Sequence, residues 1–151
     1  MEEQRPGSAE RPLMFDEGAA RTLLAEAGEA RAAAYAPYSE HPVGAALLAG
    51  DGRLFRGVNV ENASYGLSLC AERTAVAGAI TAGVRDLVAI AIAGPRDDVP
   101  CPPCGACRQV LHEIAPGLLV VTGDGVQGVK ITRLSELLPA AFDLPTEDQP
   151  R

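Results

Sequence analysis

Residues 70–93 read CAERTAVAGAITAGVRDLVAIAIA, and this stretch decides the fold because it joins a helix to a buried strand. Its first part is rich in Ala and predicts a helix that begins at Cys70 and ends near Gly83. Its last part, 87–93, is a short apolar run between residues that break regular structure, which is typical of a strand buried on both faces. A helix that leads into a buried strand is a building unit of α/β domains.

Further helices and strands are predicted on both sides of this unit. Asp16 is a plausible N-cap for a helix that runs to about Ala34, and the turn Gly50-Asp51-Gly52 joins the strands of a hairpin. The remaining elements are expected at the following ranges: strands over 43–49, 54–60, 118–122 and 126–131, a helix that begins just after Cys104, and a short helix over 132–138. This order predicts a three-layer α/β/α domain with a mixed five-stranded sheet.

The composition is that of one globular domain with two polar ends. A chain of 151 residues is long enough for a single core, which we place at 15–144, between a disordered extension (1–14) and a disordered tail (145–151). The first twelve residues have neither the apolar segment of a signal peptide nor the Arg-rich pattern of a transit peptide, and no apolar run is long enough to cross a bilayer. We therefore expect a soluble, cytoplasmic protein whose four cysteines are ligands rather than disulfides.

The charge of the chain argues against a nucleic-acid partner. Its formal net charge is −7, from 20 acidic and 13 basic residues, and the basic residues are scattered along the sequence. Phosphate backbones require clustered Lys and Arg side chains. A membrane partner is equally unexpected.

Two short motifs carry the chemistry: Cys70-Ala71-Glu72 and, further along the chain, Pro103-Cys104-Gly105-Ala106-Cys107. Three thiolates occupy three corners of a tetrahedral zinc and leave the fourth open for water, with Glu72 near enough to move that water's protons. Cys70 and Glu72 can converge on one metal only if Cys70 lies at the unwound start of its helix, since positions i and i+2 of a regular helix point to opposite sides. Arg73 can offset part of the negative charge of the thiolates.

Cys101 leaves two alternatives open. Cys101-Pro102-Pro103-Cys104 is itself a CxxC pair, and a fourth thiolate would close the metal's coordination and make the zinc purely structural. The same pair could instead be a redox motif.

Several further segments occur in the same order in a known family. These are YS (38–39), VGAAL (43–47), GVNVENASYG (57–66), CAERTA (70–75), PCGACRQVL (103–111) and LLPAAF (137–142). Together, over about residues 16–144, they resemble the small homotetrameric cytidine deaminases, zinc hydrolases of pyrimidine salvage that convert cytidine and 2′-deoxycytidine to uridine and 2′-deoxyuridine with release of ammonia.

The resemblance implies a role for each matching residue. Cys70, Cys104 and Cys107 would bind one zinc per chain, and Glu72 would shuttle protons between water, N3 and the exocyclic nitrogen of the pyrimidine. By the same similarity, the backbone of Ala71 and the carbonyl of Pro102 would hold the edge of the base. The nearest rival within this chemistry is a deaminase of another cytosine-containing molecule, such as a blasticidin-type antibiotic.

The sugar side of the site is implied by the Asn-Val-Glu-Asn segment. Asn59 and Glu61 alternate along a strand end, so both side chains lie on one face and can bind one polar group, which in the family is the ribose 3′-hydroxyl. The intact pair argues against the antibiotic-type substrate. A carboxylate beside the sugar also disfavours phosphorylated substrates.

Two aromatic positions complete the comparison. His41 stands where the family usually has Phe, so either it alters affinity, pH response or nucleoside preference, or it fills the pocket rim as bulk alone. Phe142 resembles the aromatic that relatives send from a neighbouring subunit to stack on the base. The resemblance therefore implies a homotetramer with active sites shared between subunits.

Overall fold

The computed structural model describes residues 15–145, so the predicted extension 1–14 and the predicted tail, apart from Pro145, lie outside the described residues. The chain forms the following helices and 3-10 turns: α1 (Glu17–Ala30), η1 (Arg31–Ala33), η2 (Tyr65–Leu67), α2 (Ala71–Thr81), α3 (Gly105–Ile114) and α4 (Leu134–Leu137). The strands are β1 (Gly44–Ala49), β2 (Leu54–Val58), β3 (Leu87–Ala93), β4 (Leu119–Gly123) and β5 (Val129–Arg133).

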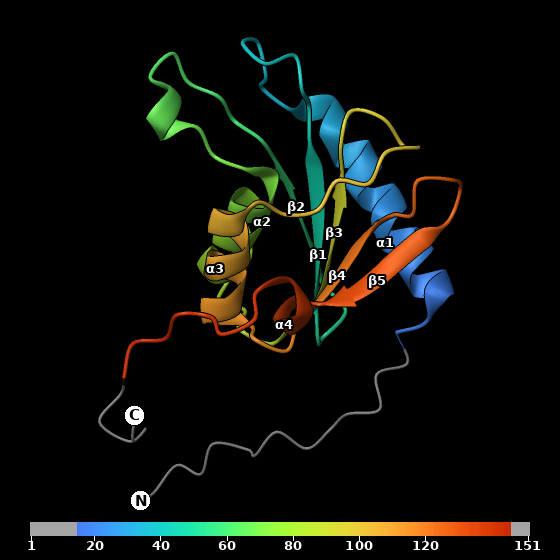
Figure 1. Ribbon diagram of the computed structural model, residues 1–151, viewed down its shortest axis with the longest axis vertical. Helices are drawn as coiled ribbons and strands as arrows, with labels where there is room; N and C mark the ends of the chain where they lie inside the picture. Colours follow the sequence, from blue (N-terminus) through green and yellow to red (C-terminus); the bar gives the residue numbers. More distant parts are fainter. Residues whose placement is uncertain (1–14, 146–151) are drawn as a thin grey trace, which may run out of the picture.

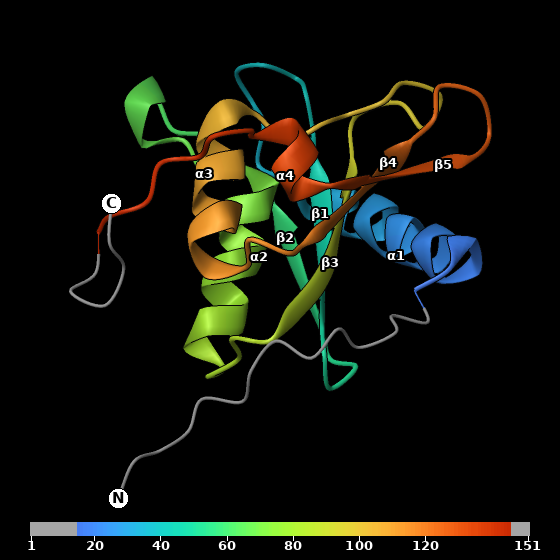
Figure 2. The ribbon, with the colours of Figure 1, turned by 60° about the horizontal axis from the view of Figure 1, so that its bottom comes forward.

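The five strands form one mixed sheet in the order β2-β1-β3-β4-β5. Only the central pair β3 and β4 is parallel, and the other neighbouring pairs are antiparallel. Figure 1 shows α1 on one side of the sheet, with α2 and α3 on the opposite side, and Figure 2 shows the same layers from another direction. The predicted three-layer α/β/α architecture with a mixed five-stranded sheet is confirmed.

The core follows from side chains that alternate between the two faces of the central strands. On β3, Ile90 and Ile92 point toward α2 and α3, whereas the small side chains Ala89, Ala91 and Ala93 face α1. All five are buried, which explains why the sequence of β3 is apolar throughout. Each fully buried Ile contributes about 1.5–3 kcal/mol through removal from water.

Two glycines allow helices to pack unusually close to the sheet. A side chain at Gly57 on β2 would place its Cβ 2.2 Å from the carbonyl oxygen of Ala71 and 2.4 Å from the amide nitrogen of Ala75. Thr74 secures this contact, because its hydroxyl group donates to Val58 O (2.8 Å) and accepts from Val58 N (3.0 Å). The N-terminus of α2 is thus fixed against the end of β2. Gly44 allows the same close approach on the other face, where its Cβ would lie 2.0 Å from Ala27 O of α1.

Several predicted strand limits differ from the observed ones by one to three residues, and two of these differences have a clear cause. β2 ends at Val58 instead of residue 60, because Val60 forms isolated bridges with Tyr35 and with Leu69 on other loops. β5 begins at Val129 instead of residue 126, because the Asp124 carboxylate accepts hydrogen bonds from Val126 N and Gly128 N and holds that segment in a loop. Within 15–145, no helix combines the length and the apolar character needed to span a bilayer.

Candidate active site

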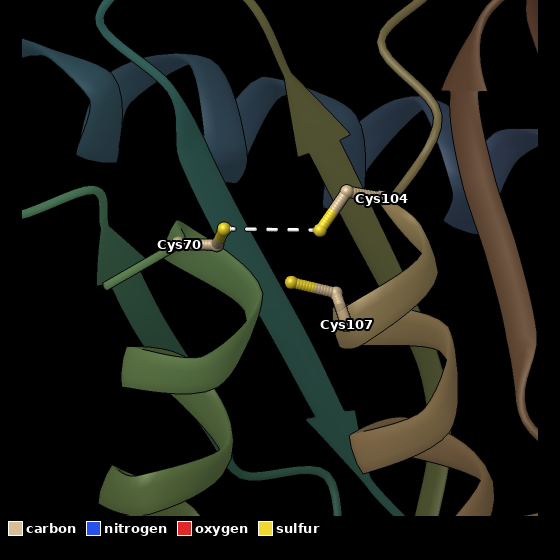
Figure 3. A group of neighbouring side chains, drawn as sticks. All are labelled: Cys70, Cys104 and Cys107. Atoms are coloured by element: carbon tan, nitrogen blue, oxygen red, sulfur yellow. Dashed lines mark hydrogen bonds between the residues drawn. The ribbon is translucent and has the colours of Figure 1, made fainter. Parts of the chain in front are cut away.

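Three cysteines converge between the N-termini of α2 and α3. Cys70 is the N-cap residue of α2, Cys104 is the N-cap residue of α3, and Cys107 lies in the first turn of α3. Figure 3 shows their three sulfur atoms pointing into the space between the two helices. The sulfurs all lie within 4.8 Å of one another, and Cys70 Sγ is 3.9 Å from Cys104 Sγ. The predicted position of Cys70 at the start of its helix is confirmed.

This geometry fits a tetrahedral zinc. Zn–S bonds of about 2.3 Å give a tetrahedron with an S–S edge of about 3.8 Å, close to the observed separation of Cys70 and Cys104. Both helix N-termini direct their positive ends at the cluster, which favours thiolates. Burial and the nearby Glu72 carboxylate raise the pKa of the Cys107 thiol in the absence of a cation, so the cluster needs a positive charge to ionise fully.

Arg73 supplies one positive charge beside the sulfurs. Its Nη2 donates to Ser68 O at 3.1 Å and lies 3.8 Å from Cys70 Sγ. The Cys70 thiol raises the pKa of the Arg73 guanidinium through this contact. Within the described residues, Arg73 Nε is the buried side-chain nitrogen that has no hydrogen-bond partner. One nitrogen of the Arg73 guanidinium group therefore interacts with the sulfur cluster through Cys70.

Glu72 is the buried carboxyl group of the site. Only 5% of Glu72 is exposed, although it lies in the first turn of α2, where acidic residues are usually solvated. Burial raises the pKa of Glu72, which moves its titration toward the range in which a carboxyl group both accepts and donates protons near neutrality. Of its two neighbours along the helix, Ala71 packs in the core and the Arg73 side chain lies beside the Cys70 sulfur.

Cys70, Ala71, Glu72 and Cys104 form the floor of a cavity of about 620 Å³. This volume falls in the range of small-molecule sites. The walls come from three segments that rise at the same end of the sheet: the loop before β1, the segment after β2, and the loop before α3. The lining residues are Tyr38, Ser39, His41, Val43, Asn59, Glu61, Tyr65, Ser68, Leu69, Cys70, Ala71, Glu72, Cys101, Pro102 and Cys104.

Asn59 and Glu61 lie on the wall of this cavity, just beyond the end of β2. The amide group of Asn59 accepts a hydrogen bond from Val43 N (2.9 Å) and donates one to His41 O (2.9 Å). The carboxylate of Glu61 accepts from the backbone of Tyr38 and from the backbone and side chain of Ser39. Both side chains therefore hold the loop that precedes β1.

The other sequence-predicted residues divide into two groups. Ala71, Pro102 and His41 line the cavity, and the His41 imidazole is exposed at its mouth. Phe142 does not line the cavity of its own chain, and 66% of it is exposed. Its backbone carbonyl accepts a hydrogen bond from Gln109 Nε2 at 2.8 Å, which fixes the C-terminal segment on α3.

The chain matches known proteins along most of its length. A family model described as the cytidine and deoxycytidylate deaminase zinc-binding region matches residues 18–122. A cytidine deaminase from Halalkalibacterium halodurans is 53% identical over 121 residues, which are 80% of this chain and 91% of the relative. The chain belongs to the cytidine deaminase family. It is an enzyme that carries one zinc ion per chain, and the three-cysteine group is consistent with that ion.

Other members of the family agree in sequence and in structure. A cytidine deaminase from Mycobacterium tuberculosis is 45% identical over 129 residues, covering 85% of this chain and 92% of the relative. The crystal structure of a cytidine deaminase from Burkholderia pseudomallei superposes with a TM-score of 0.76 at 50% identity, covering 81% of this chain and 98% of that one. Similarity to cytidine deaminases at this identity does not favour the alternative in which the metal is purely structural.

Cys101 stands apart from the three-cysteine group of this deaminase. Its side chain packs against the core cluster formed by β1, β3, α2 and α3, and its Sγ would lie 3.2 Å from a Cβ placed on Gly94. It is not part of the group whose sulfurs lie within 4.8 Å of one another among residues 15–145. A tetrahedral metal held by these three cysteines would have its fourth coordination position available to water.

Sequence reasoning missed how the wall of the cavity is held together. Tyr38 and Ser39 appeared only as part of the family resemblance, yet they supply every observed hydrogen bond to the Glu61 carboxylate. Thr74 and Gly57 were also missed, although they fix the start of α2. The available signal was a Gly in a β-strand, which often marks close approach of another backbone.

Proposed function

We propose that this deaminase converts cytidine and 2′-deoxycytidine to uridine and 2′-deoxyuridine, with water as co-substrate and ammonia as the second product. One observation carries the proposal: the buried Glu72 residue lines a single cavity together with Cys70 and Cys104 of the three-cysteine group and with the polar pair Asn59 and Glu61. This combination matches a small molecule that has an amidine-like base at one end and a hydroxylated sugar at the other.

Cys70, Cys104 and Cys107 hold the zinc in this proposal. When bound, zinc supplies the Lewis acidity that lowers the pKa of a water molecule toward neutrality. Glu72 accepts a proton from that water and delivers one to N3 of the pyrimidine, which makes C4 electrophilic. The remaining hydroxide adds to C4. Glu72 then takes the second proton from the new C4 hydroxyl group and passes it to the exocyclic nitrogen, so that the C4–N bond breaks, ammonia leaves and the C4 carbonyl forms.

A single carboxyl group can serve all of these transfers because its pKa is raised above that of a solvent-exposed carboxyl group. Burial raises the pKa of Glu72, and the neighbouring Arg73 opposes this shift in part. A carboxyl group in water would be ionised throughout the neutral range and would be a weak acid catalyst there.

Main-chain atoms on the cavity floor and polar side chains on its wall would orient the substrate. Ala71 and Pro102 line the floor beside the metal group and are suited to hold the edge of the base through main-chain atoms. Asn59 and Glu61 would bind the 3′-hydroxyl of the sugar. The carboxylate of Glu61 disfavours a phosphorylated sugar through like-charge repulsion.

His41 at the mouth of the cavity would adjust which nucleoside is preferred. Its imidazole is smaller than the usual phenyl ring and is polar. Comparison of the protein with His41→Phe on cytidine, 2′-deoxycytidine and a blasticidin-type substrate over a pH series tests this role. The role would be refuted if the kcat/KM values for the three substrates stood in the same ratios in both proteins at every pH.

The assembly and location complete the proposal. We propose a cytoplasmic homotetramer in which Phe142 of one subunit closes the active site of a neighbour. The exposure of Phe142 supports this arrangement, as does the fact that Phe142 does not line the cavity of its own chain. Sedimentation analysis tests the oligomeric state, and Phe142→Ala should raise KM if the aromatic ring stacks on a neighbour's substrate.

The decisive experiment replaces Glu72 by Gln, which removes proton transfer and keeps the size of the side chain. Glu72→Gln should retain about one zinc per chain and lose about 10²–10⁴-fold in kcat for cytidine, measured by the absorbance change as uridine forms. Glu113→Gln, on the exposed side of α3, is the matched control and should keep full activity. Turnover by Glu72→Gln at the rate of the control would refute the mechanism.

A further inference from the structure

The Glu61 carboxylate is held by a network centred on Ser39. Glu61 Oε2 accepts hydrogen bonds from Tyr38 N (2.9 Å) and from Ser39 N (3.2 Å), and Glu61 Oε1 accepts from the Ser39 hydroxyl group. The Ser39 hydroxyl oxygen also accepts from His41 N at 3.1 Å. Ser39 therefore contacts both the wall carboxylate and the residue at the mouth of the cavity.

The number of remaining hydrogen-bonding positions on Glu61 is small. An ionised carboxylate offers about four acceptor positions, two on each oxygen. The two donors on Oε2 fill that oxygen, and the Ser39 hydroxyl fills one position on Oε1. One acceptor position on Oε1 is left for a substrate.

The neighbouring amide of Asn59 is limited in the same way. Its Oδ1 accepts from Val43 N and its Nδ2 donates to His41 O, which leaves one acceptor position and one N–H for a ligand. A single hydroxyl group can donate to the open position of Glu61 and accept from the open N–H of Asn59. The wall is thus matched to one hydroxyl group.

We propose that Ser39 is a positioning residue of this deaminase: its hydroxyl group fixes the Glu61 carboxylate so that one acceptor position on Oε1 stays available to the sugar hydroxyl of the substrate. This inference rests on the proposed function, since it takes the sugar hydroxyl as the ligand of Asn59 and Glu61. It deepens that function by assigning the orientation of the wall to a residue outside the metal group.

Two features of the loop agree with this role, the second of them as a consequence of the Ser39–Glu61 hydrogen bond itself. Glu40, between Ser39 and His41, has a φ of 53°, a left-handed conformation that is unfavourable for a residue with a side chain. Such a conformation persists where surrounding contacts fix it, and it concentrates at functional sites. The hydrogen bond from the Ser39 side chain is also the largest contribution that lowers the pKa of Glu61, which keeps this carboxylate ionised as an acceptor.

The test compares Ser39→Ala with the parent protein on cytidine and on 3′-deoxycytidine, which lacks the hydroxyl group in question. We expect Ser39→Ala to raise KM for cytidine about tenfold, with kcat changed less than about twofold, and to leave KM for 3′-deoxycytidine within about twofold of the parent. Ser39→Thr, which keeps the hydroxyl group, should restore the parent KM. Ser64→Ala, in the exposed segment after Glu61, is the matched control and should change neither constant.

Glu61→Gln separates failure of the inference from failure of the proposed function. If Glu61→Gln raises KM for cytidine alone, but Ser39→Ala affects both substrates equally, the sugar role of Glu61 stands and the positioning role of Ser39 is overturned. If Glu61→Gln also affects both substrates equally, the sugar role itself is wrong and the inference falls with it. A zinc-loaded parent that deaminates neither nucleoside overturns both.

Discussion

Gly57→Ala should separate the three-cysteine group by moving one helix away from the sheet. The added Cβ would lie 2.2 Å from Ala71 O and 2.4 Å from Ala75 N, whereas real Cβ atoms essentially never approach closer than 3.0 Å. Both contacts are to backbone atoms of the first turns of α2, so no side-chain rotation can relieve them. The start of α2 must withdraw by about 1 Å, and Cys70 must move with it.

The energetic cost follows from packing and from hydrogen bonds. Overpacking of this kind costs about 1–3 kcal/mol, and withdrawal of α2 weakens both hydrogen bonds between the Thr74 hydroxyl group and Val58, each about 1 kcal/mol. A total of about 3 kcal/mol lowers the melting temperature of a domain of this size by roughly 6–12 °C. The Cys70 and Cys104 sulfurs, now 3.9 Å apart, would no longer span one tetrahedral edge. We expect zinc affinity to fall about 10–100-fold.

The assay measures stability and metal binding separately. Thermal unfolding of the chelator-treated proteins reports packing without the metal, and competition with a chromogenic chelator reports zinc affinity. The matched control is Gly78→Ala on the exposed side of α2, whose added Cβ would meet only Phe55 Cδ1 at 4.0 Å. This substitution should stabilise α2 by up to about 1 kcal/mol and leave zinc affinity unchanged. Gly57→Ala with the zinc affinity of the control would refute the reasoning that close packing on β2 positions Cys70.

Three further predictions concern the surroundings of the site. Cys101→Ser should keep one zinc per chain and full activity, because this thiol packs against the core. Loss of zinc in a metal analysis of this variant would instead support a closed site in which all four cysteines bind the metal. Gly44→Ala, whose Cβ would lie 2.0 Å from Ala27 O, should lower the melting temperature about as much as Gly57→Ala but leave zinc affinity within about twofold, since the strain falls on the opposite face of the sheet. Hydrogen bonds from Ser39 and the adjacent backbone lower the pKa of Glu61 below 4.5. The ionised carboxylate therefore stabilises the fold above that pH. This contribution to the free energy of unfolding disappears as the pH falls through the lowered pKa. The difference in unfolding free energy between the metal-free parent and metal-free Glu61→Gln should therefore shrink from about pH 7 to about pH 3 in urea titrations, and a constant difference would contradict the assignment.

The layer architecture could be predicted because the signals for it are local. The Ala-rich helix, the apolar run at β3 and the turn at Gly52 are each encoded within a few residues, and the structure confirms all of them. The ends of β2 and β5 could not be predicted in the same way. They depend on where Val60 finds partners on distant loops and on a carboxylate, Asp124, that binds the backbone after its own strand.

The candidate site likewise has some features that follow from local residue spacing and others that depend on contacts between distant segments of the chain. The spacing of the cysteines and of Glu72 places four groups on the first turns of two helices, and this much follows from helix geometry. The contacts of Asn59 and Glu61 do not follow from their alternation along a strand. They arise because the loop before β1 folds back over the end of β2, which brings Ser39 and His41 within hydrogen-bonding distance of residues about twenty positions away.

One short segment connects the two ends of the cavity. Gly57 allows α2 to pack close to β2, which determines the position of Cys70. Val58 hydrogen-bonds to the Thr74 hydroxyl group through both its main-chain N–H and its carbonyl group. The Asn59 side chain donates to His41 O and so holds the loop before β1. Because these residues are consecutive, a shift of α2 that displaces the metal group should also strain the wall that faces the sugar. Substitutions at Gly57 should therefore change both zinc affinity and KM, whereas substitutions at Ser39 should change KM alone. The backbone that the two ends of the cavity share would thus carry a displacement of the metal group to the wall that faces the sugar.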